Sequence, residues 1–240
     1  MTEKVFYEEL LPHEFEERIS HKPIGYLPLG TLEWHGVHNA LGADSIQSRG
    51  LFERAARKFG GIVFPPIWVA PDSIAGAGNG RYLIGMDMAG STEPHQQLPG
   101  SCYWIPKGLF VLLVESVLGQ AKRAGFACMV ADGHGPSRKA WGEMADTWER
   151  QFGMVLISAQ RDFPPHTWKT QNDHAARDET SVMAAVRPDL VDLSRLPADR
   201  SIVPRGIGGA DPRDAESTHG ERLLEETVEA IGKKLKERGF

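Results

Sequence analysis

The sequence predicts an α/β fold, a single three-layer α/β/α domain over residues 1–240 with a mainly parallel central sheet. Apolar stretches of strand length alternate along the chain with segments of helical periodicity, an order typical of parallel strands covered by helices. The chain has 240 residues, of which 41% are hydrophobic and 25% charged. This length and composition suit one large globular domain and leave little room for two.

The first three elements are predicted from apolar runs and the residues that break them. Residues 24–29 form the first strand. Residues 44–58 follow as a helix, because apolar side chains recur along them at helical spacing. Residues 61–64 form a short second strand, which Pro65 and Pro66 bring to an end.

The second half of the chain continues the alternation. Residues 106–124 form the clearest helix, with Pro106 in the first turn and Gly125 after the last. Residues 126–131 are almost continuously apolar, as in a strand covered on both faces. The remaining predicted elements are a helix at 139–151, a strand at 154–159, a helix beginning at 179, and a final helix at 218–238 with Thr218 and Glu221 spaced as a capping box.

Three long segments, 65–105, 162–178 and 197–214, show little periodicity. Irregular stretches of this length inside a compact domain usually serve a function such as substrate binding. Trp104 and Trp168 lie in these segments. Each is a candidate for lining a pocket, although an aromatic side chain in a loop more often anchors that loop.

Composition excludes several classes of partner and location. The net charge is −5 and no basic run offers a surface for phosphates, so we expect no nucleic-acid partner. No window approaches the roughly 18 uninterrupted apolar residues of a membrane span. The first residues lack an apolar signal region, and Cys102 and Cys128 are too few for a disulfide framework. We therefore expect a cytoplasmic protein.

Acidic and histidine side chains follow two of the predicted strands. Glu33 and His35 come after the first strand, and side chains two residues apart point the same way in extended backbone. His134 comes after the strand at 126–131. Ligands of parallel sheets bind beyond the carboxyl ends of the strands. With Asp44 and Glu179, these residues are predicted to form one metal site.

The donor set favours two metal ions over one. Carboxylates and imidazoles suit Zn²⁺, Mn²⁺ or Fe²⁺. Glu33, Asp44 and Glu179 carry three negative charges, while His35 and His134 bind as neutral donors. Two divalent ions bring four positive charges, and one hydroxide neutralises the excess. Asp44 is the candidate bridge, and the nucleophile is expected to be a water whose pKa the two metals lower to about 7.

Each of these residues alone also has an ordinary structural explanation. His134 can cap a turn between two glycines, Asp44 can be a helix N-cap, and Glu179 can be a carboxylate at a helix start. Their shared position at the ends of strands favours the metal site over three independent structural roles.

Three motifs resemble those of the creatininase (creatinine amidohydrolase) family over about residues 24–190. The first runs Leu-Pro-Leu-Gly-Thr-Leu-Glu-Trp-His-Gly-Val-His at 27–38 and is followed by Asp44. The second is Asp-Gly-His-Gly at 132–135, and the third is His-Ala-Ala-Arg-Asp-Glu-Thr-Ser at 174–181. The resemblance implies a compact α/β/α domain, often assembled as a homohexamer.

The resemblance also implies a metal-dependent amidohydrolase that cleaves a C–N bond of a small cyclic amide or formamide. Creatininase itself has a further glutamate ligand two residues after its motif histidine, where this chain has Pro136. Glu179 then takes that role, as in other members. His174 is the implied proton shuttle to the leaving nitrogen, and His38 is implied to orient a ligand.

The chain departs from the family pattern in places. Asp132 replaces the usual asparagine and is a candidate for orienting a ligand or contacting the substrate. The segment at 66–73 lacks the pattern that precedes the substrate loop of creatininase-like members. We therefore do not expect creatinine itself to be the substrate. Two alternatives stay open, namely a peptidase or amidase acting on a modified peptide, and a metal-binding member without catalytic activity.

Overall fold

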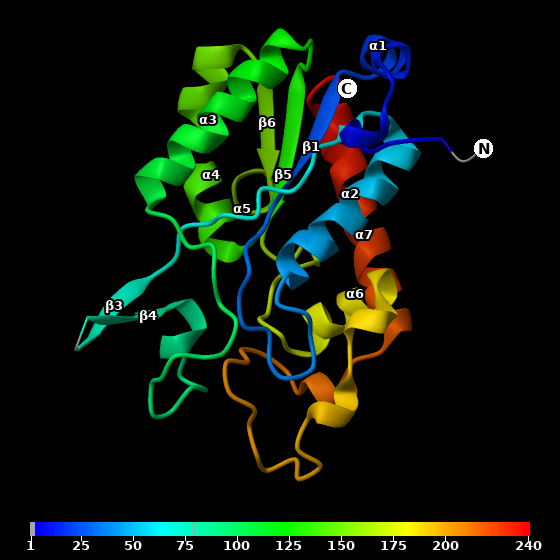
Figure 1. The fold of residues 1–240 in the computed structure, drawn as a ribbon. Coiled ribbons are helices and arrows are strands. Elements are labelled where there is room, and N and C mark those ends of the chain that lie inside the picture. Colours follow the sequence, from blue (N-terminus) through cyan, green and yellow to red (C-terminus); the bar gives the residue numbers. More distant parts are fainter. Residues whose placement is uncertain (1–2, 79) are drawn as a thin grey trace.

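Four parallel strands form the central sheet of the computed structural model, which describes residues 3–78 and 80–240 (Figure 1). The strands are β1 (Ile24–Leu29), β2 (Ile62–Val63), β5 (Cys128–Gly133) and β6 (Val155–Ser158), in the order β2-β1-β5-β6. The chain first adds β2 on one side of β1 and later β5 and β6 on the other. The crevice of such a sheet therefore lies between β1 and β5.

Helices cover both faces of this sheet (Figure 1). The helices α2 (Ala43–Phe59), α6 (Arg177–Val186) and α7 (Ser217–Glu237) pack on one face. The helices α3 (Lys107–Arg123) and α4 (Gly135–Phe152) pack on the other. The predicted three-layer α/β/α arrangement with a mainly parallel sheet is thus confirmed.

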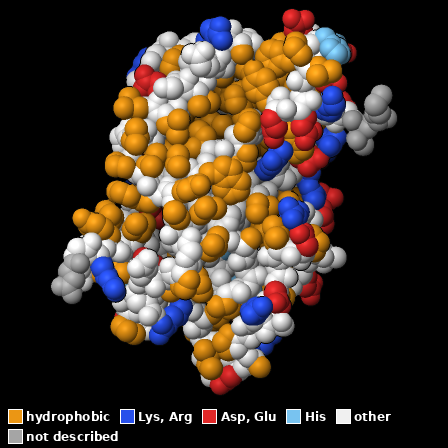
Figure 2. All heavy atoms as spheres, in the orientation of Figure 1, with side chains coloured by type: hydrophobic (Ala, Val, Ile, Leu, Met, Phe, Trp, Pro, Cys, Tyr) orange, Lys and Arg blue, Asp and Glu red, His pale blue; other side chains and the backbone are white. Residues whose placement is uncertain are grey.

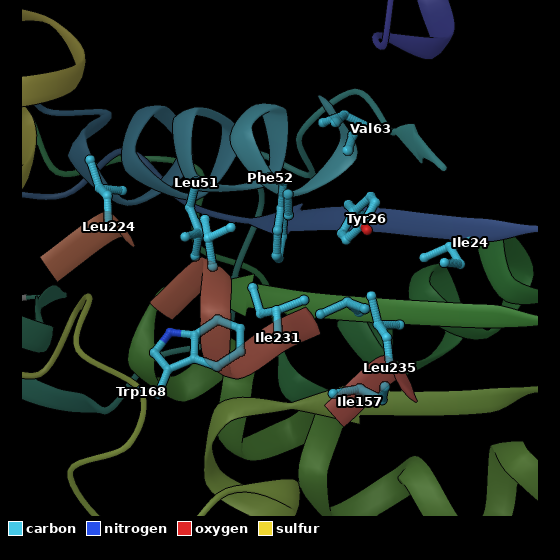
Figure 3. Close-up of a cluster of buried hydrophobic side chains, with 14 of the residues drawn as sticks. Ile24, Tyr26, Leu51, Phe52, Val63, Ile157, Trp168, Leu224, Ile231 and Leu235 are labelled. Atoms are coloured by element: carbon cyan, nitrogen blue, oxygen red, sulfur yellow. The ribbon is translucent and has the colours of Figure 1, made fainter. Parts of the chain in front are cut away.

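Side chains of β1 alternate between the two helical layers. Ile24 and Tyr26 belong to the core beneath α2 and α7, and Leu27 and Leu29 to the core beneath α3 and α4. Figure 3 shows the first of these cores, where Phe52 of α2 and Ile231 of α7 meet over the sheet. The alternation follows from the two-residue period of a strand, and it leaves both faces of β1 buried.

The remaining elements are short or lie outside the sheet. Helices α1 (Pro12–His21) and α5 (Ala159–Asp162) were not predicted, nor was the antiparallel hairpin of β3 (Ile74–Gly78) and β4 (Arg81–Ile84). Among the described residues, no helix combines the length and apolar content needed to cross a membrane. The 3-10 helices are Tyr7–Glu9, Gly85–Met88, Pro188–Leu190, Leu193–Arg195 and Pro212–Asp214.

Three predictions about helix starts are corrected. The helix expected from 179 begins at Arg177. The helix expected at 139–151 begins at Gly135, directly after His134. The capping box of the last helix does not form, because the helix begins after Glu216 and no side chain caps it. Glu221 instead forms an ion pair with Arg54 of α2. A long-range partner has replaced the local bond that the spacing suggested.

Candidate metal centre

The crevice between β1 and β5 brings the predicted ligands together. The two strands end in register, since Leu29 pairs with Gly133 and its carbonyl accepts a hydrogen bond of 2.7 Å from the backbone N–H of His134. Glu33 and His35 follow β1, and His134 stands at the start of α4. Motifs that lie about a hundred residues apart therefore meet at one edge of the sheet.

Asp44 faces two groups of donor atoms. Its Oδ2 lies 3.2 Å from Nδ1 of His134, and Oε2 of Glu33 lies 3.2 Å from the same nitrogen. Its Oδ1 lies 3.5 Å from Nε2 of His35, which is 3.8 Å from Oε2 of Glu179. Each group has the spacing of a metal site, and Asp44 is common to both. Cations held at the two groups would therefore share Asp44.

The donor atoms are buried without conventional partners. Glu33, His35, Asp44, His134 and Glu179 are all at most 6% exposed. Oε2 of Glu33, Nε2 of His35 and Oδ2 of Asp44 make no hydrogen bond with correct geometry among the described residues. Burying polar atoms without hydrogen-bond partners raises the free energy of the folded state. Cations at the two groups would satisfy all three, so the residues present fit a pair of divalent metals.

Backbone carbonyls fix the protonation of two histidines. Nδ1 of His35 lies 3.0 Å from the carbonyl of Glu33, and Nε2 of His174 lies 2.8 Å from the carbonyl of Trp34. A carbonyl oxygen can only accept, so each of these nitrogens carries the proton. Nε2 of His35 is therefore the nitrogen whose lone pair becomes available to a metal ion once it loses its own proton.

His174 lies against the cluster and is held firmly. Its ring centroid is 4.5 Å from that of His35, and its backbone exchanges two hydrogen bonds with Gly208. Burial and the neighbouring His35 lower the pKa of His174. With the proton on Nε2, the lone pair of Nδ1 is left to accept a proton.

The buried charges of the cluster shift the pKa values of its own members. Burial by itself would lower the pKa of His35, but Asp44 and Glu179 raise it to about 10. Burial, and then the charge of Asp44, raise the pKa of Glu179 to about 7. The excess of buried negative charge therefore calls for positive charge at this place.

A pocket of about 400 Å³ opens onto the cluster. One wall comes from the two ends of the β3–β4 hairpin, and another from the start of α4 and the segment before α6. Besides the candidate ligands and His174, the lining residues are Asp72, Ser73, Gly85, Met86, Gly135, Pro136, Arg138, Gln171, Asn172 and Asp173.

Two of the other candidates, His38 and Asp132, do not line this pocket and contact neighbouring side chains instead. Nε2 of His38 lies 3.0 Å from the hydroxyl of Thr180, the residue after Glu179. Asp132 is fully buried, and its carboxylate lies 3.4 Å from Nη1 of Arg138 and 3.2 Å from the indole nitrogen of Trp168. Burial raises the pKa of Asp132 to about 6, although Arg138 opposes the rise.

The two tryptophans have different surroundings. Trp168 is 3% exposed and belongs to the core beneath α7, so it anchors its loop and does not line the pocket (Figure 3). Trp104 lines a smaller neighbouring pocket beside Glu33, and its indole nitrogen donates to the carbonyl of Asp72 at 3.3 Å.

Sequence reasoning missed Asp72, Arg138 and Asp173. Asp173 accepts hydrogen bonds from the backbone N–H groups of Asp178 and Glu179, which fixes the start of α6 and with it Glu179. Arg138 had a possible signal, since a charge at the end of an apolar strand, here Asp132, requires a counter-charge. Asp72 lies in an irregular segment and offered none.

A parallel sheet with a buried cluster of carboxylates and imidazoles at its switch point defines an α/β protein with a candidate metal centre. The family model for creatininase, creatinine amidohydrolase, matches residues 8–235. The chain therefore belongs to the creatininase family and is an amidohydrolase, an enzyme that hydrolyses C–N bonds other than peptide bonds.

Relatives and solved structures agree with this family. Creatinine amidohydrolase of Pseudomonas putida is 25% identical over 272 residues, covering 99% of this chain and 98% of its own length. A crystal structure of creatininase has a TM-score of 0.75 at 23% identity, covering 99% of this chain and 98% of that chain.

Related structures carry metals and a ligand. A manganese creatininase and a Zn–Zn form of a creatininase variant each have a TM-score of 0.73 at 22% identity, covering 98% of both chains. A creatininase variant in complex with creatine has a TM-score of 0.74 at 23% identity, covering 98% of this chain and 99% of that chain. At this identity the likeness establishes the fold of this chain.

Proposed function

We propose that this protein hydrolyses a C–N bond of a small cyclic amide or formamide at a centre of two divalent metals. The observation that carries the proposal is the position of Asp44, whose two carboxylate oxygens face two separate groups of donors. A carboxylate that served only as a helix cap would have no need of a second group.

The residues divide between two sites. Glu33 and His134 would hold one ion and His35 and Glu179 the other, with Asp44 between them. Zn²⁺, Mn²⁺ and Fe²⁺ all accept this donor set. When bound, such a pair supplies a water with a pKa of about 7 and polarises a carbonyl group. The backbone N–H of Ala175 donates to Glu179 and holds that carboxylate in place.

His174 carries the proton that the reaction transfers from water to the leaving nitrogen. Hydrolysis adds water to the carbonyl carbon, breaks the C–N bond and requires a proton on the departing nitrogen. Nδ1 of His174 takes a proton from the attacking water and delivers it to that nitrogen. The bond from Nε2 to the carbonyl of Trp34 keeps the ring oriented during both transfers.

The size of the pocket supports a small substrate. A volume of about 400 Å³ lies at the lower end of ordinary ligand pockets. Comparing turnover of formamides, small lactams and short peptides tests this assignment. Hydrolysis confined to peptides would replace it with a peptidase function, and a silent panel with full metal content would indicate a binding protein.

Metal analysis with paired variants tests the centre itself. Protein purified without chelator is expected to contain about two divalent ions per chain. His134→Ala and Glu33→Ala are expected to lose metal. The matched controls His95→Ala and Glu17→Ala remove the same groups from exposed positions and are expected to keep it. Equal metal content in all four variants would refute the proposal.

The proposal extends to assembly and location. Hydrophobic side chains gather over the face formed by α3, where Leu109 and Leu112 are 54% and 61% exposed (Figure 2). This surface supports a homo-oligomer, for which a hexamer is the form that the family likeness suggests, and light scattering tests it. Both cysteines are free thiols, which supports a reducing cytoplasm.

A further inference from the structure

His134 approaches a second carboxylate with the ring nitrogen that does not face the cluster. Its Nδ1 points toward Glu33 and Asp44, while its Nε2 lies 3.5 Å from Oδ2 of Asp72. Nε2 is buried and has no hydrogen-bond partner of correct geometry among the described residues, so the carboxylate of Asp72 is its nearest ionic contact. Asp72 comes from the irregular segment before β3, outside all three family motifs.

Asp72 does not belong to either group of metal donors. Its oxygens are not among the atoms that gather within metal-ligand distance around Asp44 in the described part of the chain. In the described part of the chain, the ionic contact of its carboxylate is with Nε2 of His134. The carboxylate is therefore placed to act on the histidine and not on a cation.

Three features of the structure build this position. The backbone N–H of Ser73 donates to Oδ1 of Asp72 at 2.6 Å, and the indole of Trp104 donates to its carbonyl. Gly85 leaves the space for the carboxylate. A Cβ at Gly85 would lie 2.3 Å from Oδ2 of Asp72 and 3.0 Å from Oε1 of Glu33. The absence of that one atom lets two carboxylates approach the same histidine.

We propose that Asp72 is the positioning residue of His134. Its carboxylate accepts a hydrogen bond from Nε2–H of His134. The lone pair on Nδ1 is then directed at the cluster, and Nδ1 becomes a stronger metal ligand. Such outer carboxylates typically change metal affinity by about 10- to 100-fold. The inference rests on the proposed metal centre and assigns this chain a residue of its own for one of the two sites.

The affinity of each site for Zn²⁺, measured by competition with a chromophoric chelator, tests the inference. Asp72→Ala is expected to weaken, by about 10- to 100-fold, the same dissociation constant that His134→Ala weakens, and to leave the other unchanged. Asp72→Asn keeps an acceptor oxygen and is expected to lose less. Asp189→Ala removes an exposed carboxylate that does not line the pocket, and it is expected to change neither constant.

A second test displaces the carboxylate of Asp72 without altering it, and compares the displacing variant with a matched control. Gly85→Ala is expected to reproduce the loss seen with Asp72→Ala. Gly80→Ala is its matched control, because Gly80 has a similar backbone, φ 72° against 55°, and open space where the Cβ would go. A loss caused only by strain in the hairpin would appear in both variants and would overturn the assignment.

The remaining outcomes are also decisive. If Asp72 acts through His134, adding Asp72→Ala to His134→Ala changes nothing further. An additional loss in the double variant, or equal weakening of both sites, would overturn the inference. Wild-type protein that binds no Zn²⁺ would instead refute the proposed function. Two normal sites in both wild type and Asp72→Ala would refute only the role of Asp72.

Discussion

Asp44 lies 3.2 Å from Nδ1 of His134 through one carboxylate oxygen and turns the other toward His35. The residue sits in the first turn of α2, while the two histidines follow β1 and β5. The sheet order brings these three segments together, and the function proposed here depends on that single shared side chain.

Replacing Asp44 is expected to cost both metals. Asp44→Asn keeps the shape of the side chain but removes its charge, so we expect the metal content to fall from about two ions per chain to less than one. Glu179→Gln touches one group only and is expected to leave the other ion bound. Plasma emission spectroscopy after gel filtration measures both variants. Loss of a single ion in Asp44→Asn would argue against a shared ligand.

His174→Ala is expected to separate catalysis from metal binding. The variant removes the proposed proton carrier but none of the five proposed ligands. We expect kcat to fall by about 10²- to 10⁴-fold while metal content stays at the wild-type level. His166→Ala, an exposed loop histidine, is the control. A variant with normal kcat would remove His174 from the mechanism.

The buried pair of Asp132 and Arg138 is expected to matter for stability. The two side chains are 0% and 10% exposed, and removing one leaves the other charge uncompensated. We expect Arg138→Met to reduce the free energy of unfolding by about 3–5 kcal/mol. Adding Asp132→Asn to Arg138→Met should recover part of the loss, because the orphaned charge disappears. Urea unfolding of the single and double variants checks this, and equal stability of the two would contradict it.

The metal-free protein is expected to lose stability as pH rises above 6.5. Burial alone would lower the pKa of His35, but Asp44 and Glu179 raise it from 6.5 to about 10, so the folded state holds a proton that the unfolded state releases. This contribution is complete below pH 6.5 and disappears as pH rises toward 10. The raised pKa of Glu179, about 7, acts in the same direction.

Metal-loaded protein is expected to behave differently, because its ligands are already deprotonated and metal affinity increases with pH. The difference in melting temperature between loaded and chelator-treated samples should therefore widen from pH 6.5 toward 10. A constant difference across this range would show that the cluster does not exchange protons for cations.

Much of the sheet and of the cluster could be predicted from sequence, for physical reasons that also explain the failures. Apolar runs such as 126–131 identify buried strands, and charged residues directly after them lie at one edge of the sheet. Asp72 and the β3–β4 hairpin carry no such signal, because their segment of the sequence has neither a long apolar run nor a helical period. The capping box predicted for α7 does not form, and Glu221 forms an ion pair with the distant Arg54 instead.

Anomalous X-ray scattering from crystals grown with Zn²⁺ and with Mn²⁺, recorded at the respective absorption edges, decides whether the cluster holds a pair of metal ions. Two peaks about 3.5–4 Å apart are expected, with one oxygen of Asp44 bound to each. One peak held by Glu33 and His134 alone, or two peaks with Asp44 bound to neither, would contradict the proposed centre.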